Sequence, residues 1–260
     1  MLPWRPKFEG KLTATITATV DVGVTEHLGG TNGGSQSLID FYNEVGIRAF
    51  RTGIAWSEVE VTKGQYAITT ALDAFILQAR SVGKEPLFIL CCANQLYDGG
   101  GFPVSAAAQD AFAQYATFIA RHYKGAVMRY EVWNEWDIGL GVPGHPLGDP
   151  IVYTSLLQKV YRALKAVDPN ITVIAGATSG RDLVFADTVF KNGGLTAMDV
   201  WSAHPYVYPD PPENAMLDGG SIANGSYYSR DFFAEWCTHQ RYRGVRQHQR
   251  SGERHDARDC

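Results

Sequence analysis

The sequence lacks the features that mark membrane-spanning, disulfide-stapled and metal-binding proteins. No apolar run approaches the roughly 20 residues that a transmembrane helix needs. Four cysteines in 260 residues are too few for a disulfide framework. Cys91 and Cys92 are neighbours that would point to opposite faces of a strand, and we expect both to be buried free thiols. No spacing of cysteine and histidine indicates a metal site, and we expect neither a metal nor a cofactor.

Charge of one sign is also scarce. The formal net charge of −4 is too mild to indicate a nucleic-acid or acidic-lipid partner. The opening stretch, MLPWRPKFEG, has no apolar core of a secretory signal, and extracellular and cytoplasmic locations both stay open. A composition of 45% hydrophobic and 19% charged residues is typical of a globular protein. The oligomeric state is not indicated.

Strand and helix signals alternate along the chain, which predicts an α/β fold with a parallel sheet. Six strand–helix units in series favour a (β/α)8 TIM-barrel type of which about six of the eight βα units are present. A doubly wound sheet is the alternative, although no GxGxxG stretch follows the first strand. The expected strands are 20–24, 47–53, 86–92, 128–135, 171–175 and 198–203. The expected helices are 35–45, 71–82, 105–123, with Ser105 as its N-cap, 153–167 and 183–191.

Composition divides the chain into three parts. Residues 1–18 are expected to be an N-terminal extension and residues 19–236 a truncated barrel domain, in which 227–236 begins a further helix. Residues 237–260 are rich in Arg, His and Gln, and Val245 and Ala257 are their only aliphatic residues. Such a stretch cannot bury enough apolar surface to order itself, so we expect a disordered tail. The abrupt change suggests a truncated or out-of-frame end without strands seven and eight, and a nucleic-acid-binding tail is the weaker alternative.

The stretch from Met128 to Asp137, MRYEVWNEWD, organises the sequence. In an extended strand, side chains alternate between the two faces, which places Glu131, Trp133 and Glu135 on one side. An apolar outer face with carboxylates inside suits the inner wall of a barrel. The alternative is an ordinary core strand that ends in an exposed Asn-Glu turn.

The ends of four expected strands carry polar and aromatic residues, and parallel strands bring these ends to one rim. Aromatic rings, an amide, a histidine and a carboxylate together are typical of a sugar-binding site. Each residue also has a simpler interpretation: Arg51 as an ion-pair partner of Glu131, Trp56 as a packing residue, or His204 as a core histidine. The candidate residues are Arg51, Trp56, Asn94, Asn134, Glu135, His204 and Tyr206.

The sequence resembles the clan A glycoside hydrolases, and within them the family 39-type enzymes. The matching stretches are IRAFRTGIAWSEVEVTKGQY, the segment ending in CCANQLYDGG, AFAQYATFIARHYKG, YEVWNEWD and DVWSAHPYVYPDPPE, within about residues 22–213. The resemblance implies that O-glycosyl bonds of an oligo- or polysaccharide are hydrolysed by a retaining two-carboxylate mechanism. Carbohydrate is then the expected partner, with no nucleic acid and no membrane.

The same resemblance assigns roles to individual residues. Glu135 is the expected general acid/base, and Asn134 is expected to bind a sugar hydroxyl. Arg51 and His204 are expected around the catalytic pair. The residues expected in or near the substrate cleft are Trp56, Asn94, Trp133 and Tyr206.

One catalytic group of the family is not found. The nucleophile should be a glutamate at the end of strand seven, and nothing after Tyr208 matches it. The alternative function is therefore a catalytically inactive barrel fragment that at most binds carbohydrate.

Overall fold

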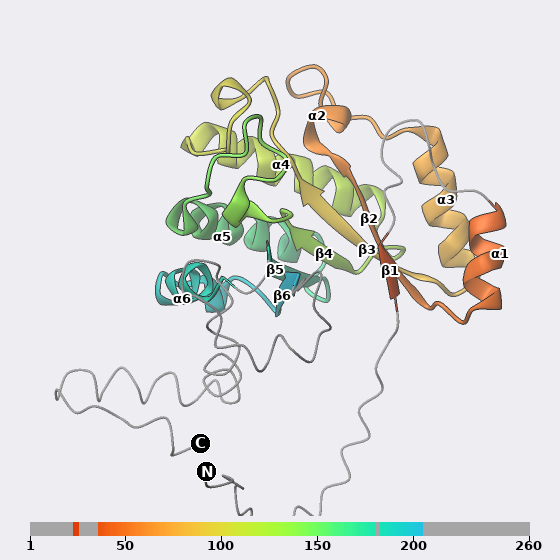
Figure 1. Cartoon of the computed structure of the whole chain (residues 1–260). Coiled ribbons are helices and arrows are strands. Elements are labelled where there is room, and N and C mark those ends of the chain that lie inside the picture. The colour runs from red at the N-terminus through yellow and green to blue at the C-terminus, as the bar shows by residue number, and fades with distance from the viewer. Residues whose placement is uncertain (1–22, 26–35, 180–181, 205–260) are drawn as a thin grey trace, which may run out of the picture.

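The computed structural model describes residues 23–25, 36–179 and 182–204 (Figure 1). The expected N-terminal extension, the 227–236 helix and the 237–260 tail lie outside these ranges. None of the helices within the described ranges is long and apolar enough to cross a membrane.

Six parallel strands form one curled sheet in the sequential order β1 to β6. The expected strands are confirmed, with shifted ends. Because the strand order never reverses, the described strands do not form the doubly wound alternative; they form part of a TIM-type barrel wall. The strands are β1 (Gly23–Thr25), β2 (Ala49–Ala55), β3 (Glu85–Cys91), β4 (Arg129–Val132), β5 (Thr172–Ser179) and β6 (Val200–His204).

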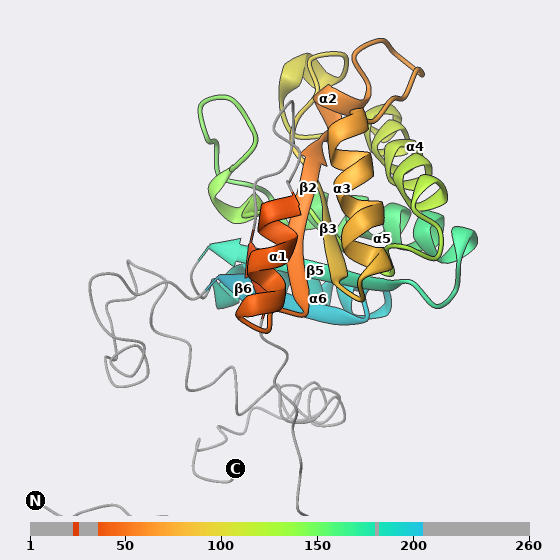
Figure 2. The ribbon, with the colours of Figure 1, turned by 90° about the vertical axis from the view of Figure 1, so that its right-hand side faces the viewer.

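Helices follow the strands in alternation and lie along one face of the curled sheet (Figures 1 and 2). The α-helices are α1 (Gln36–Glu44), α2 (Trp56–Val59), α3 (Thr70–Ser81), α4 (Ala106–His122), α5 (Pro150–Val167) and α6 (Leu183–Lys191). Three short 3-10 helices are η1 (Asp98–Gly100), η2 (Trp136–Ile138) and η3 (Gly194–Thr196).

Side-chain caps set the starts of the two longest helices. Ser105 caps α4 as expected, and its hydroxyl accepts a hydrogen bond from the Ala108 N–H at 3.1 Å. Helix α5 begins at Pro150, before the expected start at Tyr153. Its cap is Asp149, whose carboxylate accepts from the Ile151 N–H at 2.7 Å. Proline suits this first helical position because it has no N–H to leave unpaired.

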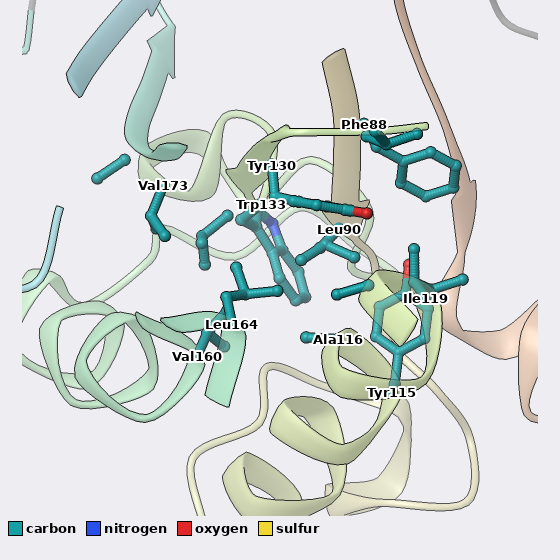
Figure 3. Packing of buried hydrophobic residues seen from close by; sticks show 14 of the residues in the cluster. Phe88, Leu90, Tyr115, Ala116, Ile119, Tyr130, Trp133, Val160, Leu164 and Val173 are labelled. Carbon is teal, nitrogen blue, oxygen red and sulfur yellow. The ribbon is translucent and has the colours of Figure 1, made fainter. Parts of the chain in front are cut away.

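The two faces of the sheet differ in chemistry. The face toward the helices is apolar, and Figure 3 shows its side chains packed against α4 and α5. The opposite face carries Arg51 and Glu131, one from β2 and one from β4, as the alternation within each strand requires. The helix-facing residues of the central strands include Phe88, Leu90, Tyr130, Val132 and Val173.

The end of β3 corrects one expectation. Cys91 and Cys92 are joined in a disulfide, so they are not free thiols, and both are partly exposed. The alternation that would separate them holds only for extended backbone, and Cys92 has a φ of 79°.

The hydroxyl of Tyr153 provides a test of how β4 and β5 are held together. This fully buried group donates to the Val132 carbonyl at 3.0 Å and accepts from the Gly176 N–H at 2.8 Å. Tyr153→Phe leaves two buried backbone groups unpaired, and we expect a loss of about 1–3 kcal/mol in unfolding free energy by urea titration. Tyr161→Phe is the control, because the contact of Tyr161 with Lys165 is made through its ring. A similar loss in both variants would contradict the role of the Tyr153 hydroxyl.

Candidate functional site

Glu135 lies in a turn beyond β4 and not in the strand itself. The strand ends at Val132, and both Trp133 and Glu135 have positive φ angles, of 70° and 49°. The Glu135 N–H donates to the Ala177 carbonyl at 2.8 Å, and the Glu135 carbonyl accepts from the Leu140 N–H at 3.1 Å. Non-glycine residues rarely adopt this conformation, and when they do they cluster at functional sites. The backbone under the Glu135 side chain is therefore held from two sides.

A bulge in β5 contributes one of these two bonds. The register of β5 against β6 shifts between Gly176 and Thr178, and Ala177 between them has a φ of 45°. Bulges redirect groups next to active sites. The expected strand ended at residue 175, before the bulge. Gly176, a glycine inside a strand, is the sequence signal that indicates it.

The carboxylate of Glu135 contacts the imidazole of His204. Glu135 Oε1 lies 2.7 Å from His204 Nδ1, and both side chains are 14% exposed. His204 is the last residue of β6, so strands four and six bring together two of the predicted residues. A carboxyl group and an imidazole at this distance share a hydrogen bond whichever of them carries the proton.

Arg51 joins β2 to β4 on the inner face of the sheet. Its Nε donates to Glu131 Oε2 at 2.6 Å, and its Nη2 donates to Asn134 Oδ1 at 2.7 Å. The side chain of Glu131 is 2% exposed, so its charge is neutralised inside the protein. Arg51 therefore pairs with Glu131 and also contacts Asn134, the residue next to Glu135.

Trp56 and Asn94, both predicted to lie in or near the substrate cleft, are buried and hydrogen-bonded within the protein. Strand β2 ends at Ala55, and Trp56 starts α2 with its indole 1% exposed and its Nε1 donating to Glu60 Oε2 at 2.6 Å. Asn94 is 3% exposed; its amide donates to the Glu60 carbonyl at 2.9 Å and accepts from the Leu96 N–H at 3.0 Å. These side chains hold the loops after β2 and β3 in place.

Trp133, also predicted to lie in or near the substrate cleft, is buried in the core. Its indole is fully buried, packs against Phe102, Phe112 and Trp136, and donates to the Leu140 carbonyl at 3.0 Å. The expected inward direction assumed continued alternation, and the positive φ at Trp133 ends that alternation. The aromatic ring therefore anchors the turn in the core below it.

Asp137 is a site residue that the sequence analysis missed. It is 6% exposed, and both of its carboxylate oxygens lie 3.0 Å from the Ser179 N–H at the end of β5. Burial, with smaller contributions from the charges of Asp182 and Glu135, raises the pKa of Asp137 to about 6, and the hydrogen bond from the Ser179 N–H opposes the shift. Its spacing of two residues from Glu135 was the available signal.

The remaining predictions for the site concern Tyr206 and metals. Tyr206 lies outside the described residues. Within 23–25, 36–179 and 182–204, no group of three or more His, Cys, Asp or Glu residues is arranged to hold a metal ion.

Comparisons with solved structures show the same fold in glycoside hydrolases. A family 39 glycoside hydrolase from the gut symbiont Bacteroides cellulosilyticus WH2 is 29% identical, with a TM-score of 0.63 over 74% of this chain and 39% of that one. An exo-β-1,4-mannosidase from Opitutaceae bacterium strain TAV5 is 18% identical, with a TM-score of 0.54 over 65% and 33%. A GH39 enzyme from Xanthomonas axonopodis pv. citri is 18% identical, with a TM-score of 0.52 over 71% and 40%.

The chain spans less than half the length of these structures. The matched part of this chain corresponds to 40% or less of the length of each of the three structures. No protein-family model and no curated protein matches the sequence.

The ion pair of Arg51 predicts an asymmetric effect on stability. Arg51→Ala leaves the charge of Glu131 buried and unpaired, and we expect it to lower the unfolding free energy by about 3 kcal/mol. Adding Glu131→Gln should restore part of that loss. Arg129→Ala is the matched control: its ion pair with Glu85, on β4 and β3, is more than a third exposed, so less than about 1 kcal/mol should be lost. Urea titration measures all of these variants, and equal losses for the two arginines would contradict the burial argument.

The raised pKa of Asp137 predicts a pH effect with a definite sign. An aspartate in the unfolded chain has a pKa of about 3.9. Between about pH 4 and 6 the native state therefore holds a proton that the unfolded state has lost. The stability that Asp137 contributes at low pH is therefore lost as the pH rises through about 6. Asp137→Asn still accepts from Ser179 and removes this titration. We expect its stability relative to the parent protein to improve by up to about 3 kcal/mol between pH 4 and 7; parallel stability curves would contradict the assignment.

Proposed function

We propose that this protein, whose described residues have the clan A glycoside hydrolase fold of the family 39 type, hydrolyses O-glycosyl bonds of an oligo- or polysaccharide with Glu135 as general acid and base. The observation that carries the proposal is the 2.7 Å contact between Glu135 and His204. It lies at the C-terminal edge of the parallel sheet, where TIM-barrel enzymes hold their catalytic groups. The structural neighbours that share this fold are glycoside hydrolases.

The proposed role of Glu135 is to move a proton twice. The carboxyl group gives its proton to the glycosidic oxygen as the C–O bond breaks, and its carboxylate then takes a proton from the attacking water. His204 binds Oε1, which leaves Oε2 to face the leaving group. The hydrogen bonds of the Glu135 backbone to Ala177 and Leu140 support this role, because a general acid must hold its position within hydrogen-bond reach of the substrate.

Asn134 is proposed to orient the sugar through its amide nitrogen. Arginine has donors and no acceptor, so the amide oxygen of Asn134 must be the atom that faces Arg51. The Asn134 Nδ2 is then left to donate to a sugar hydroxyl. Arg51 in this way selects which end of the amide is offered to the substrate.

A retaining mechanism also requires a nucleophile about 5 Å from the acid. Glu131 is engaged by Arg51, and Asp137 is engaged by the Ser179 N–H. The proposal therefore assigns the nucleophile to neither of these residues.

Leaving-group dependence tests the role of Glu135. The full chain is assayed on a panel of aryl glycosides and on the matching unactivated disaccharides. Glu135→Gln should slow cleavage of the disaccharides by about 10²-fold or more, since their leaving groups need a proton. It should affect the bond-breaking step of activated aryl glycosides much less.

The control is Glu85→Gln, at the opposite end of the strands, which should leave both rates unchanged. Equal losses on both substrate types for Glu135→Gln would remove it from the acid role. Binding of oligosaccharide without turnover by the parent chain would support the alternative function of an inactive carbohydrate-binding barrel.

A further inference from the structure

The Cys91–Cys92 disulfide lies at the C-terminal end of β3, at the same edge of the sheet as the candidate site. Parallel pairing aligns Ala55 on β2 with Cys91, and Arg51 on β2 with Leu87 on β3. Every second residue shares a face, so Cys91 lies on the same face as Arg51, at the C-terminal edge where Glu135 follows β4. Neither sulfur has a role in the mechanism proposed above.

Contacts connect this disulfide to the turn that carries Glu135. The Ala93 N–H, directly after Cys92, donates to the Gly141 carbonyl at 2.9 Å. Gly141 has a φ of 83°, and a Cβ added there would lie 3.0 Å from Cys92 Sγ and 3.1 Å from its Cα. Leu140, the neighbour of Gly141, donates its N–H to the Glu135 carbonyl at 3.1 Å. The far end of the turn, at Gly141, therefore packs against Cys92, and Leu140 connects it to Glu135.

The disulfide also accounts for the backbone conformation of Cys92. Cysteine rarely adopts a φ of 79°, because its Cβ is crowded there. The side chain of Cys92 is bonded to Cys91 and lies against Gly141. Breaking the bond removes this constraint, and we expect the reduced Cys92 to move toward extended backbone and its side chain to leave Gly141.

We infer that the Cys91–Cys92 disulfide is a reducible positioning element for the Glu135 turn. A dithiol thiolate attacks one sulfur and forms a mixed disulfide, and its second thiol then closes the dithiol ring. The protein S–S bond breaks, Cys91 and Cys92 become thiols, and the dithiol is oxidised to a cyclic disulfide with two electrons transferred. The partial exposure of both cysteines gives a small dithiol access. The positioning follows from the contacts alone, and only its effect on hydrolysis rests on the proposed function.

Hydrogen exchange detected by mass spectrometry tests the inference without any assay of activity. The full chain is prepared as Cys237→Ser/Cys260→Ser, so that Cys91 and Cys92 are the only cysteines, and is compared before and after dithiothreitol. Reduction should speed exchange of the amides in residues 133–141 by about tenfold and leave β2 and α4 unchanged. Reoxidation should reverse the change, and further substitution of Cys91→Ser/Cys92→Ser should give the fast exchange with or without dithiothreitol.

Three results would overturn the inference. One is unchanged exchange of residues 133–141 when intact mass shows both thiols reduced. Another is faster exchange across all strands, which would indicate general stabilisation and no specific positioning. The third is an untreated chain whose mass shows two free thiols. If the turn responds and the parent chain still hydrolyses no glycoside, the positioning stands and the proposed function fails.

Discussion

The guanidinium of Arg51 is the group on which the inner face of this sheet depends. Glu131 is almost fully buried, and a buried carboxylate is tolerated only with a charged partner and hydrogen bonds. Arg51 provides both from β2, across β3, and its second donor fixes the amide of Asn134. A lysine would retain the charge but not the planar fork that reaches two acceptors at once. Charge neutralisation, strand alignment and the direction of a candidate substrate contact thus depend on one side chain.

The turn after β4 obtains its rigidity from the elements around it. Trp133 fixes one end: its indole lies in the core, and its backbone N–H donates to the Leu90 carbonyl at 2.7 Å. The β5 bulge binds the middle through Ala177, and Asp137 binds the Ser179 N–H at the end of β5. Functional loops of this kind are precise because a packed scaffold supports them. Glu135 is therefore aligned mostly by apolar side chains and by backbone groups of the neighbouring elements.

Periodicity predicted the elements of the fold well and failed where the backbone leaves regular geometry. The alternation in β4 correctly placed Glu131 inside, because residues up to Val132 are extended. It failed one residue later at Trp133, where a positive φ reverses the side chain, and again at Cys92. Trp56 lies beyond the end of β2, at the start of helix α2, where the alternation of a strand no longer applies. Pairings across strands, such as Glu135 with His204, depend on register, which no local pattern contains.

The bond from the Glu135 N–H to the Ala177 carbonyl also has a consequence for biosynthesis. A ribosome delivers β4 and its turn long before the bulge of β5, and His204 follows later still. Until β5 has been made, the Glu135 N–H has water for a partner, and its left-handed conformation lacks the bond to Ala177. A domain generally folds as a unit, so pairing with β5 and β6 must wait until these strands have been made. In this protein, the segment that carries Glu135 is made early and acquires its final geometry only when strands synthesised afterwards have paired.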